Sequence, residues 1–196
     1  MSGKTIGAVA QEAQHISRDN LHFVPLVGGL GTQGNDWNAN SIARILAYKS
    51  NSTYSVLNAP ILVKNEFTKD ILIKEPDIEK VLKQGESCSI AIVGIGQIST
   101  HSTAFLSGAF QEKDLGILSE AGAAASVSIS YLDCEGKLID CEITRRSIAW
   151  PLKKRKNTKI IGIAMGDSKK EAVKATLKGG YLDILMTSLP LAKSVL

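Results

Sequence analysis

The stretch FVPLVGGLGTQGNDWNANSIARIL, residues 23–46, holds a short apolar run, a glycine-rich loop and an amphipathic segment in direct succession. The apolar run extends over residues 22–27, contains Phe and Val, and is typical of a buried strand. After the glycines, apolar residues recur at helical spacing and predict a helix over residues 37–48. A strand that leads through a loop into a helix is the repeating unit of α/β sheets.

The same unit recurs further along the chain. The β-branched run SIAIVGI, residues 89–95, predicts a central parallel strand. The run KIIGIAM, residues 159–165, predicts another buried strand, and a tight loop leads from it into a helix over residues 169–178. Other patterns predict helices over residues 5–16 and 111–121, two helices within residues 61–86 that break at Pro76, and a terminal helix. Short strands are predicted over residues 54–57 and 182–187.

One antiparallel element is also expected. Residues 127–132 and 138–144 both alternate between apolar and polar side chains, and the turn-forming sequence DCEG, residues 133–136, lies between them. This pattern predicts a β-hairpin with a four-residue turn. We therefore expect one α/β domain over residues 1–196, with a three-layer, open, mostly parallel sheet and an added antiparallel hairpin.

The composition is that of an ordinary globular protein, with 44% hydrophobic residues, 21% charged residues and a net charge of +4. Such a mild charge suits anionic small molecules as readily as nucleic acid. Cys88, Cys134 and Cys141 form no CxxC pair, and no apolar run approaches the roughly 18 residues of a membrane span. We expect reduced thiols, a cytoplasmic protein, no membrane partner, and neither a metal nor another cofactor.

Three loops share one design, in which an apolar strand ends in glycine and a helix begins with a polar residue. They comprise residues 28–32, 94–97 and 166–169. In an open parallel sheet these loops converge on the edge where the strands end. Glycine lets backbone N–H groups approach a ligand, helix N-termini favour anions, and Thr32 and Ser168 add hydroxyl groups.

Lys169 is the most informative residue of these loops. A cation at the start of a helix opposes the helix dipole by roughly 0.3–1 kcal/mol, and a bound anion would remove that conflict. The first loop matches neither GxGxxG nor GxxxxGK[ST], so dinucleotides and nucleoside triphosphates lack their fingerprints. A smaller phosphate ester is the favoured ligand, although glycine-rich turns also occur for tight geometry alone.

Several side chains near these loops allow two interpretations. Asn40 is a poor former of helix interiors and could recognise a hydroxyl group, whereas Arg44 on the same face is equally consistent with a solvated surface. Asp133 more often forms a turn than binds a ligand, and His101 closely follows the second loop. The sequence shows no nucleophile–base arrangement, no paired carboxylates near a glycine loop and no helix-turn-helix signature.

The segments VPLVGGLG, NANSIARILA, APILV, AIVGIGQIS and IIGIAMGDSKKEAVKATLKGGYLDILMTS follow one another along nearly the whole chain. Together they resemble the effector-binding domain of SorC/DeoR-type sugar-binding transcriptional regulators. The resemblance implies a fold like that of ribose-5-phosphate isomerase, glucosamine-6-phosphate deaminase and CoA transferases, used for sensing rather than catalysis. It also implies a phosphorylated sugar as effector and assembly into a homodimer or homotetramer.

The opening SGKT resembles the end of that family's first strand and loop, WGxT. We therefore expect an N-terminal helix-turn-helix domain, which would contact operator DNA, to be absent from this chain.

Carried over by position, the resemblance assigns the phosphate to the first glycine loop, the sugar to Asn40, and the pocket wall to residues 94–97. Lys169 would reach the phosphate or the sugar, and the residues that match the family's first loop would close the pocket. The candidate ligand-binding residues are Gly3, Thr5, Gly28, Gly29, Leu30, Gly31, Thr32, Asn40, Gly94, Ile95, Gly96, Gln97, Asp133 and Lys169.

Three positions depart from the family pattern. Ser126 stands where an acidic residue is common, and Ser188 and Leu189 replace both acids of the usual TDE sequence. These changes leave the sugar unidentified. They also weaken the alternative of a sugar-phosphate isomerase or deaminase on the same fold, because that chemistry needs a carboxylate base. A third alternative is a structural oligomerisation module that binds no ligand.

Overall fold

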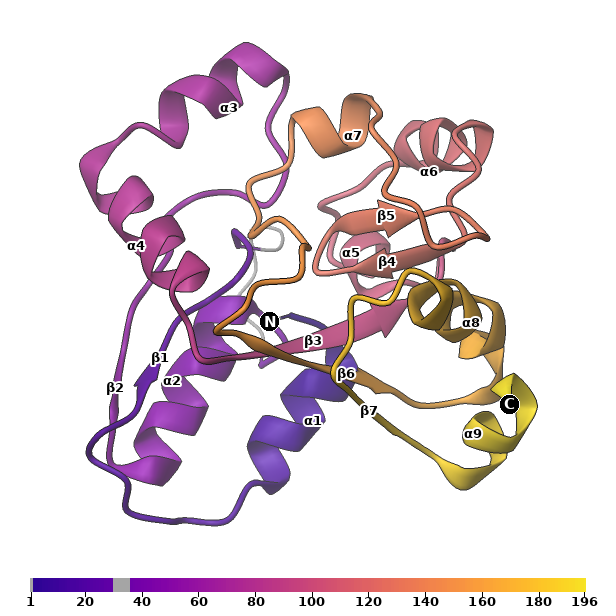
Figure 1. Cartoon of the computed structure of the whole chain (residues 1–196). Coiled ribbons are helices and arrows are strands. Elements are labelled where there is room, and N and C mark those ends of the chain that lie inside the picture. Colours follow the sequence, from indigo (N-terminus) through magenta and orange to yellow (C-terminus); the bar gives the residue numbers. More distant parts are fainter. Residues whose placement is uncertain (1, 30–35) are drawn as a thin grey trace.

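The computed structural model describes residues 2–29 and 36–196. Its main sheet has five strands in the order β5-β4-β3-β6-β7. Three of them run parallel, namely β3 (Ile90–Gly96), β6 (Lys159–Ala164) and β7 (Ile184–Thr187), and an antiparallel hairpin of β4 (Ala125–Val127) and β5 (Ser130–Leu132) extends the sheet beyond β3 (Figure 1). The expected α/β sheet with a parallel centre is therefore present.

The central strand β3 follows from its β-branched sequence. It pairs with β6 from Ile90↔Lys159 to Gly94↔Ile163, and it pairs with β4 only at its last two residues. Gly162 of β6 packs closely against Leu182. A Cβ at position 162 would lie 2.6 Å from Leu182 Cδ1. The antiparallel hairpin thus meets β3 at the end where the following loop begins.

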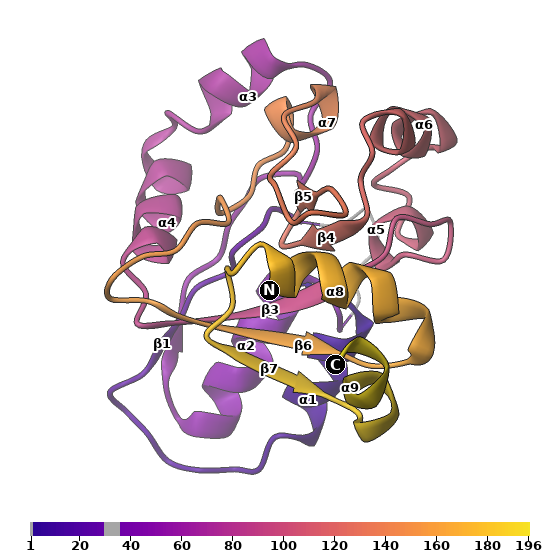
Figure 2. The same cartoon turned by 45° about the vertical axis from the view of Figure 1, so that its right-hand side comes forward.

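Helices cover both faces of this sheet and produce three layers (Figure 2). One face carries α1 (Lys4–Glu12) and α2 (Ala39–Ser50), and the other carries α8 (Lys170–Lys178) and α9 (Leu189–Val195). Ile6 and Ile163 belong to the buried core of the first face, and Val173 and Leu191 belong to that of the second. Burial of these apolar side chains on both faces is what holds the layers together.

A separate two-stranded parallel sheet packs against α2. It consists of β1 (His22–Phe23) and β2 (Thr53–Tyr54), so both strands are shorter than predicted. Pro25 has no N–H group to donate to a ladder, which limits β1. Beyond it, Val27 and Gly29 form only isolated bridges with Ala149 and Pro60.

The remaining helices are α3 (Glu66–Leu72), α4 (Pro76–Glu86), α5 (Thr103–Leu106), α6 (Glu112–Glu120) and α7 (Glu142–Arg145). They lie on two sides of the molecule: α5 and α6 lie beside the hairpin, whereas α3 and α4 lie at the opposite side of the view (Figure 1). The predicted break at Pro76 is confirmed, because this proline occupies the start of α4, where its missing N–H costs nothing. Within the described residues, no helix is long and apolar enough to span a membrane.

The predicted hairpin between residues 127–132 and 138–144 is wrong. The turn lies earlier, at Ser128 and Ile129, whose φ angles are +53° and +64°, and residues 142–145 are helical. The DCEG turn exists, but it supports only one isolated bridge, Leu132↔Leu138. Neither Ser nor Ile favours a left-handed backbone, so the alternating sequence conceals the real turn.

Candidate functional site

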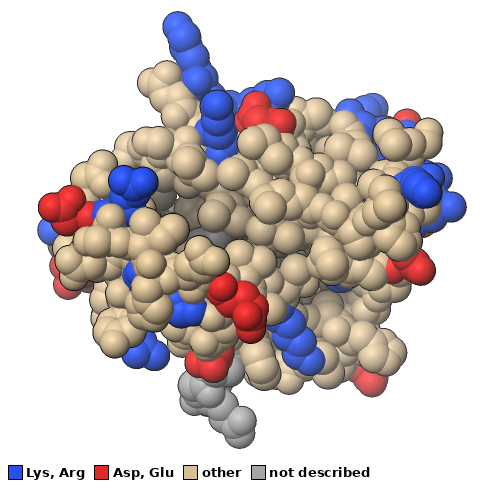
Figure 3. All heavy atoms as spheres, turned by 90° about the horizontal axis from the view of Figure 1, so that it is seen from below, with Lys and Arg blue, Asp and Glu red and all other residues tan. Residues whose placement is uncertain are grey.

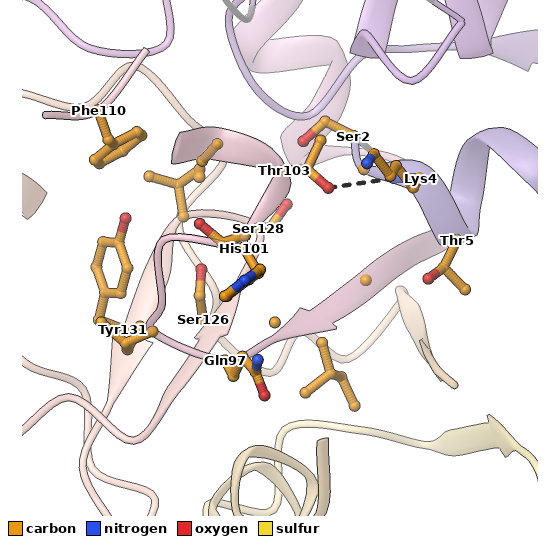
Figure 4. Close-up of a pocket in the computed structure, with 18 of the residues that line it drawn as sticks. Ser2, Lys4, Thr5, Gln97, His101, Thr103, Phe110, Ser126, Ser128 and Tyr131 are labelled. Atoms are coloured by element: carbon orange, nitrogen blue, oxygen red, sulfur yellow. Dashed lines mark hydrogen bonds between the residues drawn. The ribbon is translucent and has the colours of Figure 1, made fainter. Parts of the chain in front are cut away.

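A cavity of about 280 Å³ opens at the end of β3 (Figure 4). Its wall combines the N-terminal turn of α1, the end of β3 with the following loop, α5, the β4–β5 turn, and Lys169 of the 3-10 turn η1 (Asp167–Lys169). Because β3 and β6 are parallel, both of their following loops reach this edge of the sheet. The parallel topology therefore creates the crevice.

The structure places half of the predicted site residues in this wall: Gly3, Thr5, Gly94, Ile95, Gly96, Gln97 and Lys169. They come from the start of the chain, from the loop after β3 and from the loop after β6. These are segments distant in sequence that meet only through the sheet.

The N-terminus of α1 supplies backbone donors to the cavity. Gly3 precedes the helix with φ +111°, and its N–H donates to Trp37 O at 3.0 Å. The first intrahelical bond runs from Gly7 N to Gly3 O, which leaves the N–H groups of Thr5 and Ile6 without intrahelical acceptors. No acidic residue lies in this first turn, so the positive end of the helix dipole faces the cavity uncompensated by its own helix.

Lys169 brings a full positive charge to the lining of the same cavity. Its side chain is half-buried, and burial lowers the pKa of the ammonium group because the charged form loses hydration. None of the ion pairs among the described residues includes Lys169. An anion in the cavity would supply the charge partner that this lysine lacks.

Polar side chains from other elements lie between the start of α1 and the pair formed by Phe110 and Tyr131 (Figure 4). Gln97 donates from Nε2 to Ser99 Oγ at 3.3 Å, and Thr103 Oγ1 accepts from Lys4 N at 3.5 Å. The hydroxyl of Ser128 is buried without a partner among the described residues. Such an unpaired buried group is costly unless a ligand or water satisfies it.

The opposite end of the cavity was not foreseen from the sequence. Phe110, Leu118 and Tyr131 line it and are 5%, 1% and 3% exposed. Burial is the main cause that raises the pKa of the Tyr131 phenol far above its usual value, and the nearby Cys141 and Asp114 raise this pKa further. No local motif marks these residues, because long-range packing alone brings α6 and β5 to the end of β3.

Four candidate residues lie in other environments. A Cβ on Gly28 would lie 2.5 Å from Pro60 O, and Gly29 N donates to Ala59 O, so both glycines serve close backbone packing. Asn40 Oδ1 accepts from Leu57 N at 3.0 Å, and its Nδ2 donates to Leu57 O at 3.2 Å. Asp133 Oδ1 accepts from two backbone N–H groups of its own turn.

Three further candidates, Leu30, Gly31 and Thr32, lie outside the described residues. Among the residues that are described, no group of His, Cys, Asp and Glu side chains is arranged to hold a metal ion.

Comparison with known proteins gives a consistent match. Residues 1–196 match the protein family described as "Putative sugar-binding domain". The chain is 24% identical over 194 residues to the erythritol catabolism regulatory protein EryD of Brucella abortus, covering 99% of this chain and 61% of that protein. It is 29% identical over 195 residues to the central glycolytic genes regulator of Priestia megaterium, covering 98% and 55%.

Among solved structures, a DeoR family transcriptional regulator from Listeria monocytogenes superposes with a TM-score of 0.91 at 28% identity, covering 100% of this chain and 77% of that one. The full-length sorbitol operon regulator SorC from Klebsiella pneumoniae, at 19% identity and a TM-score of 0.88, shares the fold over 100% of this chain and 64% of its own. The chain spans only 55–61% of the length of the first curated relatives. It belongs to the family of sugar-binding domains found in DeoR- and SorC-type transcriptional regulators.

Proposed function

We propose that this domain binds a phosphorylated monosaccharide in the cavity at the end of β3 and thereby controls a transcription regulator. The observation that carries the proposal is that the α1 N-terminus and the half-buried Lys169 line the same cavity. A helix N-terminus binds phosphate through backbone N–H groups, and a lysine adds a compact charge. This cavity can therefore hold a phosphate group.

The size and polarity of the cavity set limits on the rest of the ligand. A volume of about 280 Å³ lies near the lower bound for small-molecule pockets, which suits a monosaccharide phosphate better than a nucleotide. The side chains of Gln97, Ser126 and Ser128 line the space next to the positive wall and can exchange hydrogen bonds with sugar hydroxyls.

Coupling to DNA belongs to the proposal as well. The relatives are named as regulators, and this chain matches just over half of their length. We place operator binding in a further, N-terminal domain of the whole protein. On the face shown in Figure 3, Lys and Arg side chains are interspersed with Asp and Glu around a largely uncharged centre. Such a face lacks the single-sign charge that nucleic-acid binding uses.

A homodimer or homotetramer would transmit sugar binding to the operator-binding domains, because a palindromic operator mirrors the two-fold symmetry of its protein.

Ligand sensing explains the cavity better than an isomerase or deaminase does. Those reactions move protons with a carboxylate base, and the cavity-lining residues in the described part of the chain include no Asp or Glu. Ser126 occupies the hairpin position where a carboxylate is common in the family, and it offers only a hydroxyl group.

Calorimetric titration tests the proposal. Tetrose, pentose and hexose phosphates should include at least one that binds in the micromolar range, and its unphosphorylated parent should bind far more weakly. Lys169→Met should weaken binding of the phosphorylated ligand. Lys170→Met is the matched control for this variant, because Lys170 is an exposed neighbour of Lys169 that does not line the cavity. Absence of binding across the panel by protein that still unfolds cooperatively would refute the proposal.

A further inference from the structure

The cavity has two chemically different ends (Figure 4). Ser2, Lys4 and Thr5 lie at one end, and Phe110 and Tyr131 lie together at the other, with the remaining labelled polar side chains between them. A ligand that fills the cavity must therefore place unlike groups at its two ends.

Burial shows which end is deep. Lys4 is exposed and Ser2 and Thr5 are only partly buried, so the end formed by the start of α1 is the mouth of the cavity. Phe110, Leu118 and Tyr131 are 5%, 1% and 3% exposed, so the apolar end is the floor. If the proposed function holds, the phosphate stays near the mouth, and the carbon furthest from the phosphate enters the floor.

The floor offers a sugar very little hydrogen bonding. Leu115, Leu118 and Ile129 contribute only carbon, and the phenol of Tyr131, kept protonated by burial, is the polar group of this end in the described residues. An ordinary sugar carries an oxygen on every carbon, including the last. A terminal hydroxyl that does not reach the Tyr131 phenol is buried without a partner, and this weakens binding by roughly 10- to 100-fold.

We infer that the effector is a terminally deoxygenated sugar phosphate, in which the end distal to the phosphate is a methyl group. A methyl group suits the apolar side chains of Phe110, Leu115 and Leu118, and we assign the Tyr131 phenol to the hydroxyl on the preceding carbon. The inference rests on the proposed function and narrows its ligand from phosphosugars in general to 6-deoxyhexulose or 5-deoxypentulose phosphates.

Matched ligand pairs test this choice, because the members of each pair differ by one oxygen atom. The pairs are L-rhamnulose 1-phosphate with L-fructose 1-phosphate, L-fuculose 1-phosphate with L-tagatose 1-phosphate, and 5-deoxy-D-xylulose 1-phosphate with D-xylulose 1-phosphate. Calorimetry should give at least one deoxy member that binds roughly 10- to 100-fold more tightly than its partner. Equal or reversed affinities in every pair that binds would overturn the inference.

The outcomes separate the two proposals. If other sugar phosphates bind while no deoxy member does, the deoxygenated class is wrong and the proposed function stands. If no phosphorylated ligand binds, the proposed function fails as well.

Variants of the floor provide a second test. Phe110→Tyr and Leu115→Ser each place a hydroxyl group beside the ligand's terminal carbon, and each should shrink the preference for the deoxy member to less than about threefold. Leu115 is only partly buried, so Leu115→Ser should fold even if Phe110→Tyr does not. Leu106→Ser, at a 56% exposed position outside the cavity, is the control and should keep the full preference. Unchanged preference in a folded Leu115→Ser protein would contradict the assignment of the floor.

Discussion

Lys169→Met removes one charge from the cavity wall while keeping an unbranched side chain of similar length. If the ammonium contacts the phosphate, the substitution removes a charge-assisted hydrogen bond of about 1.5–3 kcal/mol. The dissociation constant of a phosphorylated ligand should then rise by roughly 10- to 100-fold. Binding of the unphosphorylated sugar should change by less than about threefold, because that ligand does not meet the charge.

The same substitution should act in the opposite direction on the unliganded protein. Burial lowers the pKa of Lys169, so the unfolded chain holds this proton more tightly than the folded one does. The resulting cost to stability is fully present below the folded pKa, and it disappears as the pH rises from the folded pKa to the ordinary lysine value. Lys169→Met lacks this cost, so near neutral pH it should be at least as stable as the parent protein.

Two measurements check this reasoning. Calorimetry gives the affinities for a phosphorylated and an unphosphorylated ligand, and urea unfolding at about pH 7 and about pH 10 gives the free energies of unfolding. The stability difference between Lys169→Met and the parent should be smaller at the higher pH. Equal losses of affinity for both ligands, or the same losses in Lys170→Met, would show that Lys169 does not contact the phosphate.

Three further substitutions test the framework around the cavity. Asp114→Asn breaks the buried ion pair with Arg146, and urea unfolding should show a free energy of unfolding lower by about 3–5 kcal/mol. Its control, Glu79→Gln, breaks an exposed ion pair with Lys83 and should lower the free energy of unfolding by less than about 1 kcal/mol. Asn40→Ala leaves the backbone N–H and C=O of Leu57 unpaired and should lower the free energy of unfolding by about 1–3 kcal/mol in the same assay. A roughly tenfold loss of ligand affinity at unchanged stability would instead place Asn40 in the site. Gly136→Ala should lower the free energy of unfolding by more than about 3 kcal/mol, because the new Cβ would lie 2.2 Å from Gly179 N. Its control, Gly108→Ala, has a similar positive φ but open space around the new Cβ, and it should lower the free energy of unfolding by only about 1–2 kcal/mol.

Local signals predicted the two loops of the cavity that follow β3 and β6, whereas Gly3 and Thr5 were assigned by the family resemblance. A β-branched run that ends in glycine, as in β3 and β6, identifies both the strand and the loop that follows it. Parallel pairing then brings the end of β3 and Lys169 to one edge of the sheet.

The rest depended on packing that a single segment does not reveal. Ser128 and Ile129 form a tight turn without glycine because the paired, buried strands on either side impose their left-handed backbone. An asparagine suits hydroxyl recognition and backbone pairing equally well, and only the position of Leu57 shows that Asn40 does the latter. Phe110 and Tyr131 belong to no sequence motif. They form a cavity floor only because the hairpin and α6 pack together in the folded structure.

The two ends of the cavity differ in what it would take to change them. Apart from the Lys169 side chain, the positive end is built largely from backbone, namely the start of α1 and the end of β3, so altering this backbone means altering the sheet and its covering helix. The floor is built from side chains of α6, of Phe110 just before it, and of the hairpin at the edge of the sheet, so exchanging them should affect the central strands less. If the proposed function holds, a fold organised in this way can keep one phosphate site and accept different sugars. The specificity of this protein should therefore be sought in Phe110, Leu115 and Tyr131 rather than in the glycine loops.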